Sequence, residues 1–180
     1  MSVSPSNPEI VPATLADVGK IVELLHTVNQ HIYGKTGSPE WSDIKGATER
    51  INIAVQSNRD FFIQATDGRK AIGNVILDQS DTQNWSDAGD NALYIHQLMA
   101  HPEEGRGLGR YLLGFAAGQA LGAKRRWLRL DCREASRGLK AYYERLGFIP
   151  QGVISYPSRR PRVSYQVEAA FLDDQPQTND

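Results

Sequence analysis

Residues 93–122 constrain the fold most, because they have the pattern of a strand, a tight turn and a helix in direct succession. Residues 93–100 are nearly all apolar or β-prone, as expected of a strand buried on both faces. Pro102 cannot donate a hydrogen bond to a sheet and ends the strand. Apolar residues at helical spacing then predict a helix that begins near Leu108.

The turn between this strand and helix has glycine at alternate positions, namely Gly105, Gly107 and Gly109. Glycines let the backbone approach a ligand closely, and the first turn of a helix offers unpaired N–H groups and a positive dipole end, so the turn suits a phosphate group. A P-loop would need Gly-Lys-Ser/Thr where Arg110-Tyr111 stand. A G-x-G-x-x-G fingerprint that began at Gly105 or at Gly107 would need its last glycine at position 110 or 112, where the chain has Arg110 and Leu112. A glycine-rich turn that binds nothing is the plain structural alternative.

Residues 101–113, HPEEGRGLGRYLL, resemble the acetyl-CoA signature of the GNAT N-acetyltransferase superfamily, which runs Arg/Gln-x-x-Gly-x-Gly/Ala after a strand and a proline. A second stretch, LRLDC at 128–132 followed by LKAYYERLGF at 139–148, resembles the later strand and helix of that family. The two motifs occur in the expected order and separation. The resemblance covers residues 60–153.

The resemblance implies a mixed α/β (α+β) fold with a mostly antiparallel central sheet of six to seven strands. Two parallel strands in it would splay apart, and about four helices would flank the sheet. We expect one N-acetyltransferase domain over residues 9–172, a flexible lead at 1–8 and a disordered tail at 173–180.

The remaining pattern predicts the other elements. A strand at 9–13 and a capping box at Thr14–Asp17 precede a helix that buries an apolar stripe and ends at the loop 34–39. Further expected elements are a helical region at 41–57, a hairpin of strands 60–66 and 70–77, a surface loop at 78–91, a strand at 127–132, a helix at 134–146 closed by Gly147, and strands at 148–154 and 162–171.

Composition narrows the class of protein. A chain of 180 residues suffices for one domain with its own core, and a net charge of -1 argues against non-specific binding to nucleic acid or to a membrane surface. Cys132 is the one cysteine, so no internal disulfide framework exists, and we expect it to be a small buried hydrophobe. The N-terminal residues lack the pattern of a signal peptide, and a cytoplasmic location is expected.

By resemblance, acetyl-CoA is the acyl donor and no metal is needed. The pantetheine arm would lie along Leu98, Met99 and Ala100. The pyrophosphate would be held mainly by backbone amides of the turn, at Gly105, Arg106, Gly107, Leu108, Gly109 and Arg110. Two positions depart from the family pattern: Glu104 stands where Arg or Gln is usual, and Ser136 replaces an Asn that often contacts the cofactor.

The resemblance assigns Tyr143 as the acid that protonates the leaving thiolate, with its neighbour Tyr142 as a less favoured candidate. A phenol keeps its proton at neutral pH and can therefore act as an acid. His96 is the candidate base, because imidazole accepts protons near neutrality. A water chain, or Glu23 or Glu40, is the alternative to His96.

Tyr33 and Trp41 flank the 34–39 loop, where the family has its acceptor pocket, and they either line this pocket or are core aromatics. Asp131 could orient the amine or a water relay. The expected acceptor is a small-molecule amine or a peptide amine. The basic connection at 158–162 lies near the acceptor in the family or is a solvated loop. The alternative function is a catalytically inactive acyl-CoA-binding sensor of the same fold, and a homodimer is compatible with the resemblance.

Overall fold

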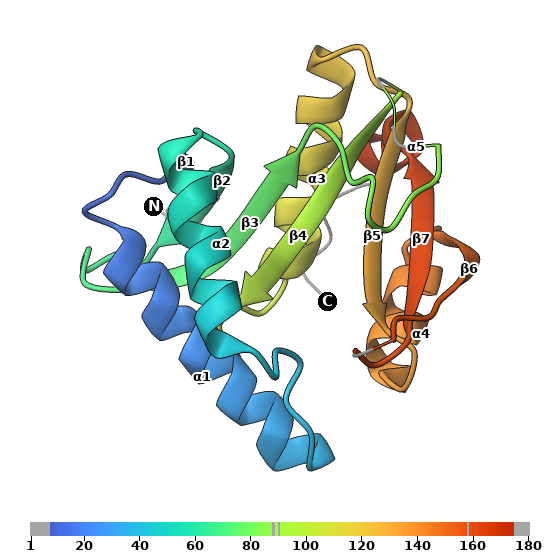
Figure 1. Ribbon diagram of the computed structural model, residues 1–180. Coiled ribbons are helices and arrows are strands. Elements are labelled where there is room, and N and C mark those ends of the chain that lie inside the picture. Colours follow the sequence, from blue (N-terminus) through green and yellow to red (C-terminus); the bar gives the residue numbers. More distant parts are fainter. Residues whose placement is uncertain (1–7, 88, 90, 158, 175–180) are drawn as a thin grey trace. The chain divides into compact units, whose positions relative to one another are not determined.

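The computed structural model describes residues 8–87, 89, 91–157 and 159–174 (Figure 1). The expected flexible lead, apart from its last residue, and the expected tail, apart from Asp173 and Asp174, lie outside these residues. Asp173, the first residue of the expected tail, is the last residue of a helix.

Seven strands and five helices occur within the described part of the chain. In chain order they are β1 (Ile10–Pro12), α1 (Val18–Thr36), α2 (Ile44–Gln56), β2 (Asp60–Gln64), β3 (Ala71–Asp78), β4 (Ala92–Ala100), α3 (Leu108–Gly122), β5 (Trp127–Arg133), α4 (Arg137–Arg145), β6 (Ile149–Ile154), β7 (Arg162–Glu168) and α5 (Ala169–Asp173). The strands follow the order β1-β2-β3-β4-β5-β7-β6. The pairs β1–β2, β2–β3, β5–β7 and β6–β7 are antiparallel, whereas β4–β5 is parallel. The expected mixed, mostly antiparallel sheet with one parallel pair is therefore confirmed.

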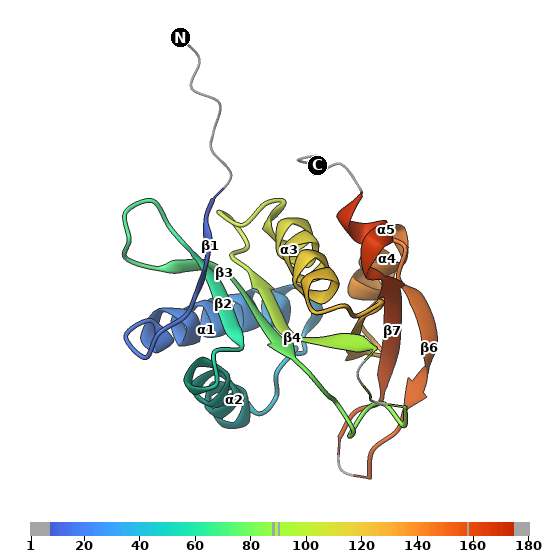
Figure 2. The same ribbon diagram turned by 90° about the horizontal axis from the view of Figure 1, so that it is seen from above.

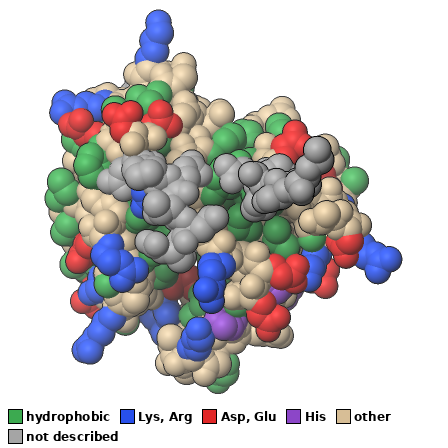
Figure 3. Space-filling model, turned by 180° about the vertical axis from the view of Figure 1, so that it is seen from behind, with side chains coloured by type: hydrophobic (Ala, Val, Ile, Leu, Met, Phe, Trp, Pro, Cys, Tyr) green, Lys and Arg blue, Asp and Glu red, His purple; other side chains and the backbone are tan. Residues whose placement is uncertain are grey.

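The chain forms two compact units. Among the described residues, the first contains 8–76 and 97–112, and the second contains 77–96 and 113–174. No helix in the described residues combines the length and the apolar character that crossing a bilayer requires. Figure 3 shows basic and acidic side chains interspersed on the face it presents, in keeping with the small net charge.

In the first unit, α1 and α2 lie side by side and enclose a hydrophobic core (Figure 1). The predicted apolar stripe of α1 is buried at Ile21, Leu25 and Val28, while Val18 and Ile32 are partly buried against the same core. Strands β2 and β3 form the predicted hairpin, with Gly68 at its turn in the left-handed conformation at φ 72°.

The helix α1 is longer than expected. The sequence predicted that it ends at the loop 34–39, but Gly34 lies inside the helix. A glycine in an exposed helix costs only about 1 kcal/mol, and the helix continues to Thr36. It ends at Gly37, which takes the left-handed conformation and donates its N–H to the Tyr33 carbonyl at 2.8 Å.

In the second unit, β7 lies between β5 and β6, and both pairs are antiparallel. Figure 2 shows β6 and β7 side by side. Gly147 closes the helix before β6 as expected, at φ 89°. The prediction that the last strand continues to Phe171 is wrong. It ends at Glu168, because Ala169 donates its N–H to the Arg126 carbonyl at 2.8 Å and starts the short helix α5, whose Ala169 and Leu172 are buried.

The segment between β3 and β4 is anchored by a buried arginine. The Arg129 guanidinium on β5 lies 4.2 Å from the centre of the Trp85 ring and donates to both carboxylate oxygens of Asp87, at 3.0 and 2.9 Å. It also donates to the Tyr94 hydroxyl at 3.2 Å. Trp85 and Tyr94 belong to a small buried cluster, so a segment expected to be a surface loop is held to the core at its centre.

Candidate functional site

The glycine turn before α3 has a tightly defined backbone. The Gly105 N–H donates to the His101 carbonyl at 2.7 Å, and the Leu108 N–H donates to the Gly105 carbonyl at 3.0 Å. A Cβ at Gly105 would lie 2.5 Å from the backbone N and O of His101, which no real side chain tolerates. Gly107 has a φ of 77°, a conformation that favours glycine. The turn therefore requires glycine at 105 for space and at 107 for conformation.

This turn leads directly into the first turn of α3. Leu108 is buried and fixes the start of the helix, and the Tyr111 N–H donates to the Gly107 carbonyl at 3.1 Å. The first amides of any α-helix have no partner within the helix and lie at the positive end of its dipole. Arg106 is exposed and Arg110 half-buried on the same segment. The residues present thus fit the diphosphate that the sequence predicts here.

Glu104, which stands where the family usually has Arg or Gln, has a basic partner in the same unit. Lys70, immediately before β3, forms an ion pair and a hydrogen bond with the Glu104 carboxylate. The hydrogen bond to Glu104 raises the pKa of Lys70 above its ordinary value, so the lysine is fully charged at neutral pH. Lys70 therefore offsets the negative charge that Glu104 brings to the turn. Sequence reasoning missed Lys70, because 34 residues separate the two.

The backbone of strand β4 is irregular immediately before the predicted pantetheine-binding residues. Gln97 has a φ of 46°, in the left-handed region, and its Nε2 donates to the Ala47 carbonyl at 3.0 Å. Such irregularities re-aim the residues of a strand and are frequent beside active sites. After it, Met99 is buried, and Leu98 and Ala100 are half-buried. A glutamine carries no sequence signal for this conformation.

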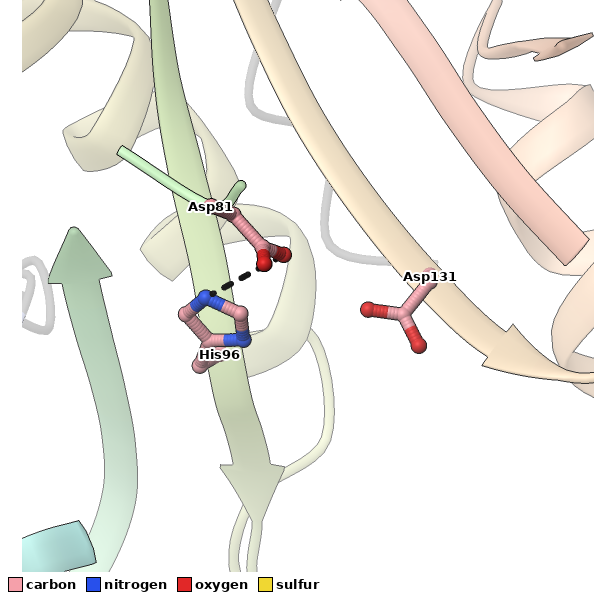
Figure 4. Close-up of side chains that lie close together, drawn as sticks. All are labelled: Asp81, His96 and Asp131. Atoms are coloured by element: carbon pink, nitrogen blue, oxygen red, sulfur yellow. Dashed lines mark ion pairs between the residues drawn. The ribbon is translucent and has the colours of Figure 1, made fainter. Parts of the chain in front are cut away.

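In the second unit, the candidate base His96 lies among carboxylates (Figure 4). Its Nε2 is 3.5 Å from Asp78 Oδ2 and 3.7 Å from Asp81 Oδ2. Asp131, on β5, belongs to the same cluster, so the structure brings together two residues that the sequence singled out separately. Asp131 is itself paired with Arg162. Asp78 and Asp81 were missed, because they lie at the edge of a polar segment without periodicity.

The candidate acid Tyr143 is buried in an aromatic cluster. Its ring lies 5.5 Å from that of Tyr142, 5.6 Å from Phe148 and 6.1 Å from Tyr165, centre to centre. The Tyr165 hydroxyl donates to Glu144 at 2.9 Å, and burial followed by this hydrogen bond raises the pKa of Tyr165. The cluster fixes the Tyr143 ring, as either a catalytic or a structural tyrosine requires.

The other predicted residues have simpler surroundings. Ser136 precedes the first residue of α4, and its carbonyl accepts the Lys140 N–H at 3.0 Å. Tyr33 lies within α1 and is 58% exposed. Trp41 packs against the core of the first unit, with its backbone N–H and carbonyl bound to the Asn29 side chain, both at 3.0 Å. Cys132 is buried, as expected.

Comparison with known proteins agrees with this arrangement of turn, strand and helix. The model of the Acetyltransferase (GNAT) family matches residues 23–148. The chain therefore belongs to the GNAT acetyltransferase family. Among curated proteins, no match was found.

Several solved structures share the fold. An acetyltransferase of the GNAT family from Listeria monocytogenes is 25% identical, with 89% of this chain and 94% of that chain covered and a TM-score of 0.71. One from Streptococcus agalactiae is 19% identical, with the same coverage and TM-score. An aminoglycoside acetyltransferase in complex with coenzyme A and kanamycin is 18% identical, with 93% and 98% covered and a TM-score of 0.65. The last two similarities concern the fold alone.

Proposed function

We propose that this protein transfers the acetyl group of acetyl-CoA to an amine by direct attack, with a small molecule as the acceptor. The observation that carries the proposal is the turn at Gly105, which has no room for a side chain and leads into the first turn of α3. Membership of the GNAT family supports acetyl-CoA as the donor. The donor supplies an activated thioester, so the protein has to bind, orient and move protons.

The cofactor would be held by one continuous stretch of the first unit. Backbone groups of Leu98, Met99 and Ala100 would bind the pantetheine arm, and the amides of residues 105–110 would bind the pyrophosphate. Lys70 adds positive charge beside the turn and removes the electrostatic cost of Glu104.

Proton transfer would involve two residues of the second unit. His96 would take a proton from the attacking amine, directly or through water, and the carboxylates beside it would stabilise the imidazolium that forms. Tyr143 would give a proton to the departing thiolate. Tyr33, Trp41 and Asp131 would contribute to the acceptor site.

Titration calorimetry with acetyl-CoA, followed by thiol release across a panel of amines, tests this proposal. Binding with turnover on a small amine is the expected result. Binding without turnover on any amine would support the acyl-CoA sensor instead. Absence of binding would overturn the placement of the cofactor.

The role of Lys70 is tested by a pair of variants. Lys70→Met leaves Glu104 unpaired beside the phosphates, and we expect acetyl-CoA affinity to fall about tenfold, equivalent to about 1.4 kcal/mol. The double variant Lys70→Met/Glu104→Gln should recover most of that loss, because the negative charge is gone as well. Equal affinity of both variants would show that Lys70 acts independently of Glu104.

A further inference from the structure

Three side chains of the second unit converge on one point from different elements. His96 comes from β4, Asp81 from the segment that follows β3, and Asp131 from β5 (Figure 4). One ligand atom of each lies within 4.8 Å of the other two. The side chains are only 10%, 8% and 8% exposed, respectively. A histidine nitrogen and two carboxylate oxygens in such a half-buried group form a ligand set for a divalent metal.

The distances from His96 Nε2 to the two nearest carboxylate oxygens are close to those between two ligands of one metal ion. His96 Nε2 lies 3.7 Å from Asp81 Oδ2, and Asp78 Oδ2 lies 3.5 Å from the same nitrogen. Charge-assisted hydrogen bonds between nitrogen and carboxylate oxygen are about 2.7–2.9 Å long. Ligands of a tetrahedral zinc ion at bond lengths of about 2.0–2.1 Å are separated by about 3.4 Å. Asp78 is therefore placed to complete or adjust the coordination.

The two carboxylates of the triad are already oriented by neighbouring groups. Asn84 donates its Nδ2 to Asp81 at 2.7 Å and its backbone N–H at 3.3 Å, and the Tyr156 hydroxyl bonds in turn to the Asn84 side chain. Arg162 binds the other carboxylate, Asp131. Outer contacts of this kind hold metal ligands in position and strengthen binding. Arg162 also offsets part of the negative charge of the group. With Asp78 included, the group contains three carboxylates and a single imidazole.

We propose that Asp81, His96 and Asp131 form a binding site for a divalent transition-metal ion, with Zn²⁺ as the ion that suits one imidazole and two carboxylates best. Three protein ligands leave a fourth position for water or Asp78. Acetyl transfer does not need the ion. In the proposed enzyme, Zn²⁺ would occupy the lone pair of His96 Nε2, so the ion would act as a reversible inhibitor.

Metal binding to the isolated protein tests the site without acetyl-CoA or an acceptor, so the result does not depend on the proposed function. Calorimetry with Zn²⁺ should give one site per chain. Co²⁺ should produce the visible absorption of a low-symmetry protein site, and Zn²⁺ should displace it. No heat with Zn²⁺ and no visible absorption with Co²⁺ would overturn the proposal.

Matched variants locate the ion. His96→Gln and Asp81→Asn should each weaken Zn²⁺ binding by about tenfold or more, whereas Asp67→Asn, in the exposed hairpin turn of the first unit, should leave it unchanged. Unaltered binding in both cluster variants would place the ion elsewhere and refute the proposal. Because a variant could unfold, the wild-type protein provides a second measurement: Zn²⁺ should shift the ¹⁵N resonance of His96 Nε2, and an unshifted resonance at saturation would also refute it.

Discussion

Gly105 and Gly107 are held to glycine by different constraints, and this difference can be used experimentally. Any Cβ at Gly105 collides with the backbone of His101, so a substitution there disrupts the turn itself. At Gly107 the constraint is the left-handed φ of 77°, which Asn and Asp tolerate better than other residues. A pair of variants at Gly107 can therefore separate charge from backbone strain.

We expect Gly107→Asp to weaken acetyl-CoA binding about tenfold relative to Gly107→Asn, because the two side chains have nearly the same shape and only the aspartate repels phosphate. Calorimetric dissociation constants of the two variants check this, with the stability of each measured alongside. Equal affinities would mean that the pyrophosphate does not lie at this turn.

Tyr143 is the residue for which burial alone does not separate catalysis from structure. If it protonates the thiolate, Tyr143→Phe should lower single-turnover rates by about 100-fold, with acetyl-CoA affinity within about twofold of wild type. Tyr142→Phe is the matched control and should stay within about twofold in both. A near-normal rate for Tyr143→Phe would leave it a structural aromatic.

At this scale the sequence singled out the glycines and Tyr143 from motifs, and His96 and Asp131 from their places on strands. Their roles in binding and catalysis stay predictions. The sequence did not locate Lys70, Asp78 or Asp81, because their significance comes from partners that lie at least fifteen residues away or in a segment without periodicity. The left-handed Gln97 also left no trace, since tertiary contacts rather than local propensity hold it.

Among the elements, the segment between β3 and β4 depends on the arginine beneath it. Arg129 is buried, and the hydrogen bond from its guanidinium lowers the pKa of Asp87 below the ordinary range. This segment also carries Asp81 and Asn84. The contacts of Arg129 with Trp85 and Asp87 therefore help to keep Asp81 and Asn84 in position at the candidate site.

We expect Arg129→Met to lower the free energy of unfolding by about 2 kcal/mol, because Asp87 and the Tyr94 hydroxyl lose a buried charged donor. Urea denaturation measures the change, and hydrogen exchange should quicken over residues 79–91. Arg126→Met, which removes an exposed pair with Glu168, is the control and should change stability by about 0.5 kcal/mol at most. Similar losses in the two variants would contradict the anchoring role of Arg129.

Element boundaries were predicted well where a single residue enforces them and poorly where propensities compete. Gly147 and the hairpin turn at Gly68 were placed correctly, because both need a positive φ. The end of α1 and the last strand were misplaced. Gly34 is tolerated in an exposed helix, and the backbone contact of Ala169 with Arg126 ends the strand before its apolar pattern does.

Across the whole molecule, the stability of the native state depends on a buried carboxyl group in the first unit. Asp60 is fully buried, its Oδ1 accepts a hydrogen bond from Asn74 Nδ2 at 2.5 Å, and its Oδ2 has no hydrogen-bond partner among the described residues. Burial raises the pKa of Asp60 from 3.8 to about 7. The folded protein therefore keeps this proton over a pH range in which the unfolded chain has already released it.

The sign of the resulting pH dependence is fixed. Below about pH 4, Asp60 is protonated in both states. Between about pH 4 and 7, only the unfolded state releases the proton, so the free energy of unfolding decreases as pH rises, by on the order of 4 kcal/mol in total. Above about pH 7 this contribution is constant.

Asp60→Asn should remove this contribution. The stability of the variant relative to wild type should rise by on the order of 4 kcal/mol between pH 4 and pH 8 and then level off. Urea denaturation curves at several pH values measure it. A constant difference across this range would mean that Asp60 is ionised throughout.

The packing of Arg129 against Trp85 has an optical consequence. Indole emission responds to nearby charge and to water, and here a guanidinium lies 4.2 Å from the ring centre of a buried tryptophan. With Trp41 and Trp127 replaced by Phe, the fluorescence of Trp85 would come from the same segment that carries Asp81. Release of that segment would shift the emission to longer wavelength, so the protein contains a built-in, label-free reporter of order at its candidate site.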